Sequence, residues 1–201
     1  MEKHRTIQDI ISLPKRFYSE EHVSFYSLLK LSGYFELYEQ IGEADIFAAL
    51  TQHLEYADQW LSWSENKRSS SGWYLKEIEN GKYVVGYFPL HNDLKNTCDD
   101  KIEACSIFIK REIEDVRKMD HCRVCGLYIE TLPWGEDGNS PTYEICPCCG
   151  VEFGYEDYTA ESAKQYREKW IHEGANWFQP KQQPENWDRQ QQSKNIPDNF
   201  L

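Results

Sequence analysis

Two short stretches, HCRVCG at residues 121–126 and EICPCCG at residues 144–150, each hold a C-x2-C pair followed by glycine. The four paired cysteines are Cys122, Cys125, Cys146 and Cys149. Tetrahedral zinc takes four ligands, at about 2.3 Å where they are sulfur, and each C-x2-C turn delivers two thiolates to one ion. The glycine lets the backbone turn tightly because it has no Cβ. The spacing therefore predicts one structural zinc site.

The 20 residues between the two pairs suit the hairpin of a zinc ribbon. The expected strands are LYIETLPW at residues 127–134 and PTYEI at residues 141–145, with GEDGNS at residues 135–140 as the turn. Four thiolates close the coordination sphere and leave no position for a water or a substrate. The predicted zinc is therefore structural rather than catalytic.

Other uses of these thiols remain open. A thioredoxin-like motif has a single C-x-x-C, and a disulfide framework conflicts with a reducing compartment. Iron, alone or in an iron–sulfur cluster, takes the same four thiolates. Cys148 is the spare thiol and an alternative ligand, although the i, i+3 spacing favours Cys146 and Cys149. His121 beside the first pair is another alternative ligand, although it is expected rather to lie on the surface or to form a hydrogen bond to a sulfur.

The charge of the 201-residue chain is −12. Residues 1–119 carry 15 basic and 20 acidic side chains, and residues 120–201 carry 7 and 14. This balance opposes direct nucleic-acid binding and favours a basic protein partner, although acidity also simply keeps a protein soluble. No run of 18 apolar residues and no apolar leader is present, which predicts a cytoplasmic protein without a membrane span.

An α+β fold in two modules is expected, with the boundary near Met119. Residues 1–119 are a helical module with a β-hairpin, and residues 120–201 are a zinc-ribbon module with a helix and an extended tail. Apolar spacings of three and four predict a helix over residues 99–120, with the stripe Ile102, Cys105, Ile109, Ile113 and Val116. A second such stripe predicts one helix over residues 42–63: Ile46, Leu50, Leu54, Ala57 and Leu61.

Shorter signals complete the prediction. Residues 20–40 indicate short helices broken at Gly33, and Asn80-Gly81 indicates a two-residue hairpin turn. Thr159 is the expected N-cap of a helix that runs to about Glu173. Its ribbon-facing side chains are expected to be Ala163, Tyr166, Trp170 and Ile171. The Gln-, Asn- and Pro-rich residues 179–201 predict an extended or loosely packed arm, with Trp177, Phe178 and Trp187 as candidate anchors.

Four stretches follow one another between residue 122 and about residue 197: CRVCG, SPTYEICPCCGVEFGYED, YREKWIHEGANWF and PENWD. In motifs and spacing this part resembles an uncharacterised family of small bacterial cysteine-rich proteins of the CPCC type. The resemblance implies a small zinc-binding fold and no known activity. The two-module architecture is similar in style to immunity proteins from bacterial toxin loci.

These observations favour a non-catalytic protein that binds and neutralises a basic, toxin-like protein. The chain has no phosphate loop, no Gly-x-Ser-x-Gly and no His-Glu-x-x-His, and no catalytic residue is predicted. One alternative is an accessory protein that contacts nucleic acid or transcription machinery. Another is an enzyme whose first module uses His22, His53 or His91 for acid–base chemistry. Glu156 and Asp157 are a further acidic pair, most simply solvated loop acids.

Overall fold

The chain divides into two units, Met1–Arg117 (unit 1) and Lys118–Leu201 (unit 2). The computed structural model describes residues 2–67, 72–88 and 95–201. Unit 1 combines helices with a three-stranded antiparallel sheet, and unit 2 contains a four-cysteine cluster and a long helix. The α+β prediction is therefore confirmed.

Unit 1 is built mainly from helices. In chain order its elements are α1 Glu2–Ile11, α2 Leu13–Ser19, α3 Phe25–Leu31, α4 Tyr34–Leu37, α5 Glu43–Gln52, α6 Leu54–Asn66, β1 Gly72–Ile78, the 3-10 turn Glu79–Gly81, β2 Lys82–Phe88, β3 Asn96–Cys98 and α7 Lys101–Arg117. The predicted helix over residues 99–120 is confirmed as α7. The predicted break at Gly33 is also confirmed, since this residue separates α3 from α4 with a left-handed φ of 79°.

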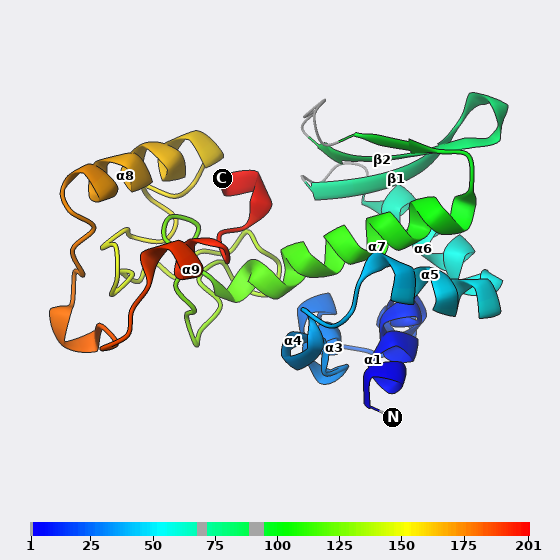
Figure 1. Ribbon diagram of the computed structural model, residues 1–201, viewed down its shortest axis with the longest axis horizontal. Helices are drawn as coiled ribbons and strands as arrows, with labels where there is room; N and C mark the ends of the chain where they lie inside the picture. Colours follow the sequence, from blue (N-terminus) through cyan, green and yellow to red (C-terminus); the bar gives the residue numbers. More distant parts are fainter. Residues whose placement is uncertain (1, 68–71, 89–94) are drawn as a thin grey trace. The chain divides into compact units, whose positions relative to one another are not determined.

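Helix α7 forms the centre of unit 1. It contacts α3, α5, α6 and all three strands, and the β1–β2 ribbon lies along it (Figure 1). The rings of Trp60 and Phe108 meet with centroids 6.0 Å apart. The Cys105 thiol is fully buried and donates to the Ala57 carbonyl at 3.6 Å. Burial raises the pKa of this thiol to about 12, as expected of a core residue rather than a reactive one.

The helix predicted over residues 42–63 is in fact two helices. The backbone of His53 leaves the helical region with φ −140° and ψ 66°, which ends α5 and starts α6. This break shifts the phase of the stripe, so that Leu50 stays fully buried but Leu54 is 59% exposed. Trp60 takes the core position on α6 instead, and its indole nitrogen donates to the Ile11 carbonyl at 2.9 Å.

The predicted hairpin is present, but its turn has three residues rather than two. Ile78 pairs with Lys82, which leaves Glu79, Asn80 and Gly81 to make the connection. Asn80 and Gly81 both have positive φ, at 67° and 69°, so the residue types were a correct turn signal. The sequence did not indicate β3, which pairs with β2 and completes the sheet order β1-β2-β3.

Unit 2 has one long helix, α8 Ala160–His172. Its shorter elements are the 3-10 turns Lys118–Asp120, Pro180–Gln182 and Asp198–Phe200, and α9 Arg189–Ser193. The predicted cap is confirmed, because the Thr159 side chain accepts from the Ser162 backbone N–H at 3.1 Å. Ala163 and Trp170 face inward as expected, whereas Ile171 is exposed.

Candidate metal centre

The first cysteine pair lies in a tight turn held by three backbone hydrogen bonds. The Cys122 N–H donates to the Leu127 carbonyl at 2.9 Å, and the Gly126 N–H donates to the Cys122 carbonyl at 2.8 Å. The Ile129 N–H donates to the Asp120 carbonyl at 2.7 Å. This turn, residues 120–129, is called knuckle 1 below.

The second pair lies in a turn with the same three bonds. The Cys146 N–H donates to the Val151 carbonyl and the Gly150 N–H to the Cys146 carbonyl, both at 2.9 Å. The Phe153 N–H donates to the Glu144 carbonyl at 3.0 Å. Residues 144–153, knuckle 2, therefore repeat knuckle 1 at a fixed offset. Sequence analysis did not identify this repeat, because outside the C-x2-C-Gly core the paired positions share little.

The strands predicted at residues 127–134 and 141–145 do not form. Each knuckle instead closes on itself, through the isolated bridges His121–Tyr128 and Ile145–Glu152. The segment between the knuckles is a loop in which the Thr142 N–H donates to the Pro133 carbonyl at 2.9 Å. Pro133 and Pro141, at the ends of these segments, have no backbone N–H to donate to a hairpin ladder.

The four predicted ligand sulfurs are brought together. Their Sγ atoms all lie within 4.8 Å of one another, and the Cys122–Cys149 and Cys125–Cys146 pairs are both 3.7 Å apart. A tetrahedral site with metal–sulfur bonds of about 2.3 Å needs sulfur–sulfur edges of about 3.8 Å. All four residues are at most 5% exposed. The cluster therefore has the composition, size and burial of a structural metal site.

The electrostatics of the cluster also suit a cation. Burial raises the pKa of the thiols of Cys122, Cys125 and Cys149. Their hydrogen bonds lower the pKa of Cys146 far below its ordinary range. Without an ion, one thiolate would be sheltered by three thiols, since four thiolates this close would repel one another strongly. A divalent ion would allow all four to ionise.

The spare thiol and the nearby histidine have other partners. Cys148 is buried, lies outside the group of four, and accepts a hydrogen bond from Gln192 Nε2 at 3.4 Å. His121 is also buried, which contradicts a surface position, and its Nδ1 lies 2.5 Å from an Asp120 carboxylate oxygen. Its ring meets the Tyr128 ring edge-on rather than a sulfur.

The end of the tail, from Gln192 to Phe200, is packed against the cluster, so the prediction of a loose arm is wrong for this part, whereas residues 181–186 are exposed. Gln192 Nε2 also donates to the Cys125 carbonyl at 3.0 Å. A Cβ on Gly126 would lie only 2.3 Å from the Gln192 carbonyl oxygen. Ile196 and Phe200 are buried in the same core as the cysteines. Sequence reasoning missed Gln192 because it lies in a Gln-rich run whose composition carries no core signal.

Helix α8 supplies a cation beside the cysteine turns. Arg167 donates through Nε to the Val124 carbonyl at 2.8 Å and also bonds the Phe200 carbonyl. Burial lowers the pKa of its guanidinium, although the nearby cysteines oppose this shift. Arg167 thus joins knuckle 1, α8 and the end of the tail.

The acidic pair beyond knuckle 2 has structural contacts. The Asp157 carboxylate accepts from the Gly154 N–H at 2.8 Å and from Trp134 Nε1 at 3.0 Å, and it is fully buried. Glu156 accepts from the Glu152 N–H at 2.9 Å. Asp157 is therefore not a solvated acid, because it holds the loop after knuckle 2 onto Trp134.

Two of the three histidines considered for catalysis lie in the described residues, and neither has the other as a neighbour in sequence. His22 is exposed, His53 Nδ1 lies 3.7 Å from Glu55, and His91 lies outside the described residues. A hollow of about 470 Å³ opens between α5 and α7. The described residues that line it include no histidine: Glu43, Ala44, Phe47, Asp100, Glu103, Ser106 and Ile107.

Fold and site together define a two-unit α+β protein with a buried four-cysteine cluster able to hold a structural metal ion. In residues 2–67, 72–88 and 95–201, no helix is both long and apolar enough to cross a membrane. No family model and no solved structure matches the chain.

Two proteins of Bacillus subtilis strain 168 are similar to part of the chain. The chain is 36% identical over 87 residues to the uncharacterized protein YoaQ. The matched region covers 35% of this chain and 72% of that protein. It is 33% identical over 84 residues to the uncharacterized protein YozI. This matched region covers 34% of this chain and 69% of that protein. The chain therefore belongs to the family of these two proteins.

Proposed function

We propose that this protein is a non-catalytic, zinc-stabilised binding protein. Its most concrete role is that of a cytoplasmic immunity or antitoxin-like protein that binds and neutralises a basic, toxin-like protein. The acidity of both units and the two-module architecture, which is similar in style to that of immunity proteins, support this role. The buried four-sulfur cluster is the observation that carries the zinc assignment.

Zinc is the ion that best suits this donor set. Four buried thiolates in a tetrahedron of this size are typical of structural zinc and leave no open ligand position. Iron takes the same donors, so metal analysis decides between them. A small unit that lacks an extended sheet also gains much of its folding free energy from the ion.

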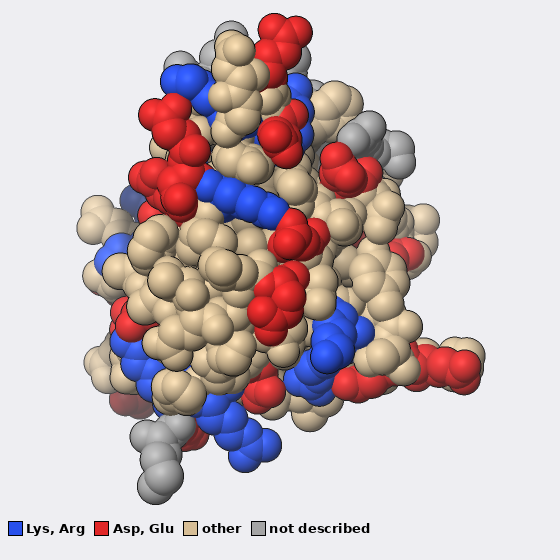
Figure 2. All heavy atoms as spheres, turned by 90° about the vertical axis from the view of Figure 1, so that its right-hand side faces the viewer, with Lys and Arg blue, Asp and Glu red and all other residues tan. Residues whose placement is uncertain are grey.

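The charge pattern supports a basic partner. Acidic side chains are spread over the face shown in Figure 2, with basic side chains and neutral areas between them. Such a distribution attracts a cationic protein at long range and speeds the encounter. Specific contacts then depend on local surfaces.

Contact with nucleic acid is less well supported. Knuckle 1 and knuckle 2 contain no lysine and one arginine, Arg123, whose guanidinium lies 3.5 Å from the Trp134 ring centroid. It also donates to the Gly138 carbonyl at 3.0 Å and lies over the Phe200 ring. A side chain held in this way serves packing, and it is poorly placed to reach a phosphate.

The test is affinity purification of the tagged full-length chain from its source, with mass spectrometry and metal analysis on the same sample. We expect one zinc per chain and one tightly bound basic protein whose toxicity is suppressed on co-expression. One iron per chain would overturn the zinc assignment. The absence of a stoichiometric partner in repeated purifications would overturn the binding role.

A further inference from the structure

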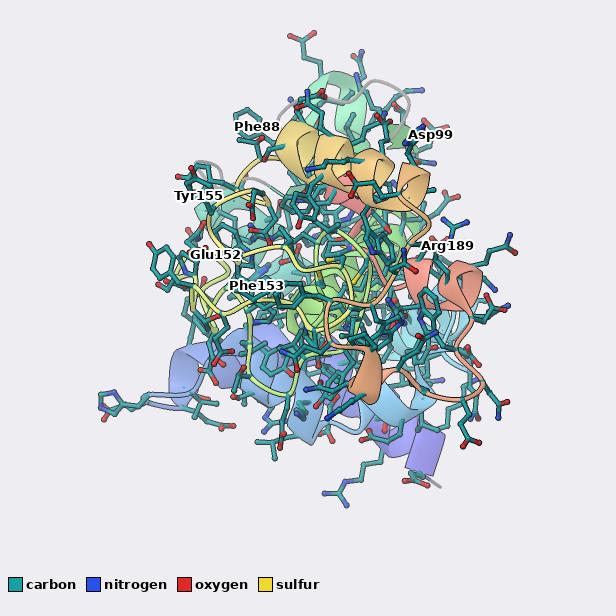
Figure 3. The ribbon with its side chains drawn as sticks, turned by 90° about the vertical axis from the view of Figure 1, so that its left-hand side faces the viewer. Phe88, Asp99, Glu152, Phe153, Tyr155 and Arg189 are labelled. Carbon is teal, nitrogen blue, oxygen red and sulfur yellow. The ribbon has the colours of Figure 1, made fainter. Side chains whose placement is uncertain are left out.

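Three exposed tyrosines surround knuckle 2. Tyr143, Tyr155 and Tyr158 are 64%, 73% and 67% exposed, whereas Phe153 between them is buried. Figure 3 shows this contrast, with Phe153 directed inward and Tyr155 at the periphery. Grouped, exposed aromatic side chains are typical of protein interaction sites rather than of an inert surface. These three residues are called the tyrosine surface below.

The first part of this surface is fixed by packing on a glycine. Tyr143 has a left-handed backbone, with φ 60°, which is rare for an aromatic residue. A Cβ on Gly154 would lie 3.2 Å from Tyr143 Cε1 and 2.5 Å from Pro141 Cβ. The Tyr143 ring therefore lies against the backbone immediately before Tyr155.

The second part is fixed by the buried acid. The Tyr158 ring is 5.9 Å from the Trp134 ring, centroid to centroid. Trp134 donates to the Asp157 carboxylate, which also accepts from the Gly154 N–H. One network thus connects the backbone that carries all three tyrosines. A surface ordered before binding loses little conformational entropy when a partner docks.

The charge around the surface selects the partner. Residues 143–158 contain no lysine or arginine, and three of their acids keep exposed surface: Glu144, Glu152 and Glu156. Tyrosine rings attract ammonium and guanidinium groups through their π faces. Arginine in particular stacks on aromatic rings while it bonds carboxylates.

We propose that the tyrosine surface docks an arginine- and lysine-bearing segment of a protein partner. This inference rests on the proposed function and gives it a location in unit 2. The rings contact the aliphatic stems and cationic ends of the partner's side chains, and the carboxylates around them complement its charge.

The test is fluorescence anisotropy with a labelled decapeptide of alternating arginine and glycine. The protein samples are the full-length chain, the triple variant Tyr143→Asn, Tyr155→Ser, Tyr158→Ser, and the control Tyr18→Ser, an exposed tyrosine of unit 1. Asparagine is used at residue 143 because it tolerates a left-handed backbone. Metal content and the melting curve establish that each variant is folded. Tyr155→Ser alone serves if the triple variant does not fold.

We expect the triple variant to bind at least about tenfold more weakly, since each exposed cation–π contact contributes roughly threefold. Tyr155→Ser is expected to bind about threefold more weakly, and Tyr18→Ser to bind like the parent. Equal binding by the parent and the tyrosine variants would overturn the location while leaving a basic partner in place. No binding by any sample would overturn the docking proposal, and a toxin-like partner recovered by purification would still support the proposed function.

Discussion

Replacing Gly126 by alanine tests whether the tail is docked on knuckle 1. The glycine has φ 73°, and an added Cβ would lie 2.3 Å from the Gln192 carbonyl oxygen and 3.1 Å from the Ile196 backbone nitrogen. Both contacts are with backbone atoms, so no side-chain rotation can relieve them. We expect Gly126→Ala to displace α9 and the residues that follow it.

The magnitude follows from what the tail loses. Each large side chain, Ile196 and Phe200, gains about 1.5–3 kcal/mol from burial, and each Gln192 hydrogen bond gains about 1 kcal/mol. Recovered backbone entropy of roughly 1–2 kcal/mol per residue offsets much of this sum. A net change of about 2 kcal/mol in favour of the open tail would raise its population roughly 30-fold.

Limited trypsin digestion measures this change, because Arg189 and Lys194 lie within the displaced segment. The cleavage rate follows the open population when opening is fast. Gly138→Ala is the matched control, since Gly138 is in the same unit, has φ 68°, and would meet only Met119 Cε at 3.7 Å. Both variants carry the cost of a left-handed alanine, about 1–2 kcal/mol. Similar cleavage rates in the two variants would refute the docked tail.

Three further predictions address the metal centre, the core and the effect of acid. Cys125→Ser should lose the metal and unfold unit 2, as measured by metal analysis and near-UV circular dichroism. The control Cys98→Ser should keep its full metal content. A C125S protein with full metal content would contradict the assignment of Cys125 as a ligand. Leu50→Ala should lower the free energy of unfolding of unit 1 by about 2–5 kcal/mol, and Leu54→Ala by less than about 0.5 kcal/mol; equal losses in urea titrations would argue against the break between α5 and α6. Burial opposes ionisation of the Glu114 carboxyl, but its hydrogen bonds with a tyrosine and a lysine outweigh burial and hold its pKa below 4.5. The ionised carboxylate therefore stabilises the fold above pH 4.5, and this stabilisation is lost as the pH falls through the lowered pKa. Glu114→Gln should reduce the fall of the melting temperature in acid.

The clustering of the four cysteines was predictable because its signal is local. A C-x2-C-Gly turn needs only neighbouring residues, and the two turns repeat the same hydrogen bonds. The cap at Thr159 and the apolar stripe of α7 are local signals of the same kind, and each gave the right element. These elements are predictable because the hydrogen bonds and contacts that form them join residues close together in the sequence.

The errors concern choices made at long range. A stripe with a spacing of three and four cannot show that the backbone of His53 breaks the helix, because the break is stabilised by the core that Trp60 enters. The polar composition of the tail indicated a loosely packed arm, but composition does not show which individual side chains are buried. Gln192, Ile196 and Phe200 are enough to dock it, because a glycine opposite them leaves the necessary space.

The cysteine cluster and the tyrosine surface share one segment of the chain. Knuckle 2 contains two of the four clustered cysteines, Cys146 and Cys149, and residues 143–158 also carry the whole tyrosine surface. Phe153 is buried in the core formed by the cysteines, with exposed Tyr155 two residues later. Loss of the ion would release the knuckle and with it the order of the three rings. On the proposed function, zinc is therefore more than a fold stabiliser, because it preorganises the surface that meets the partner.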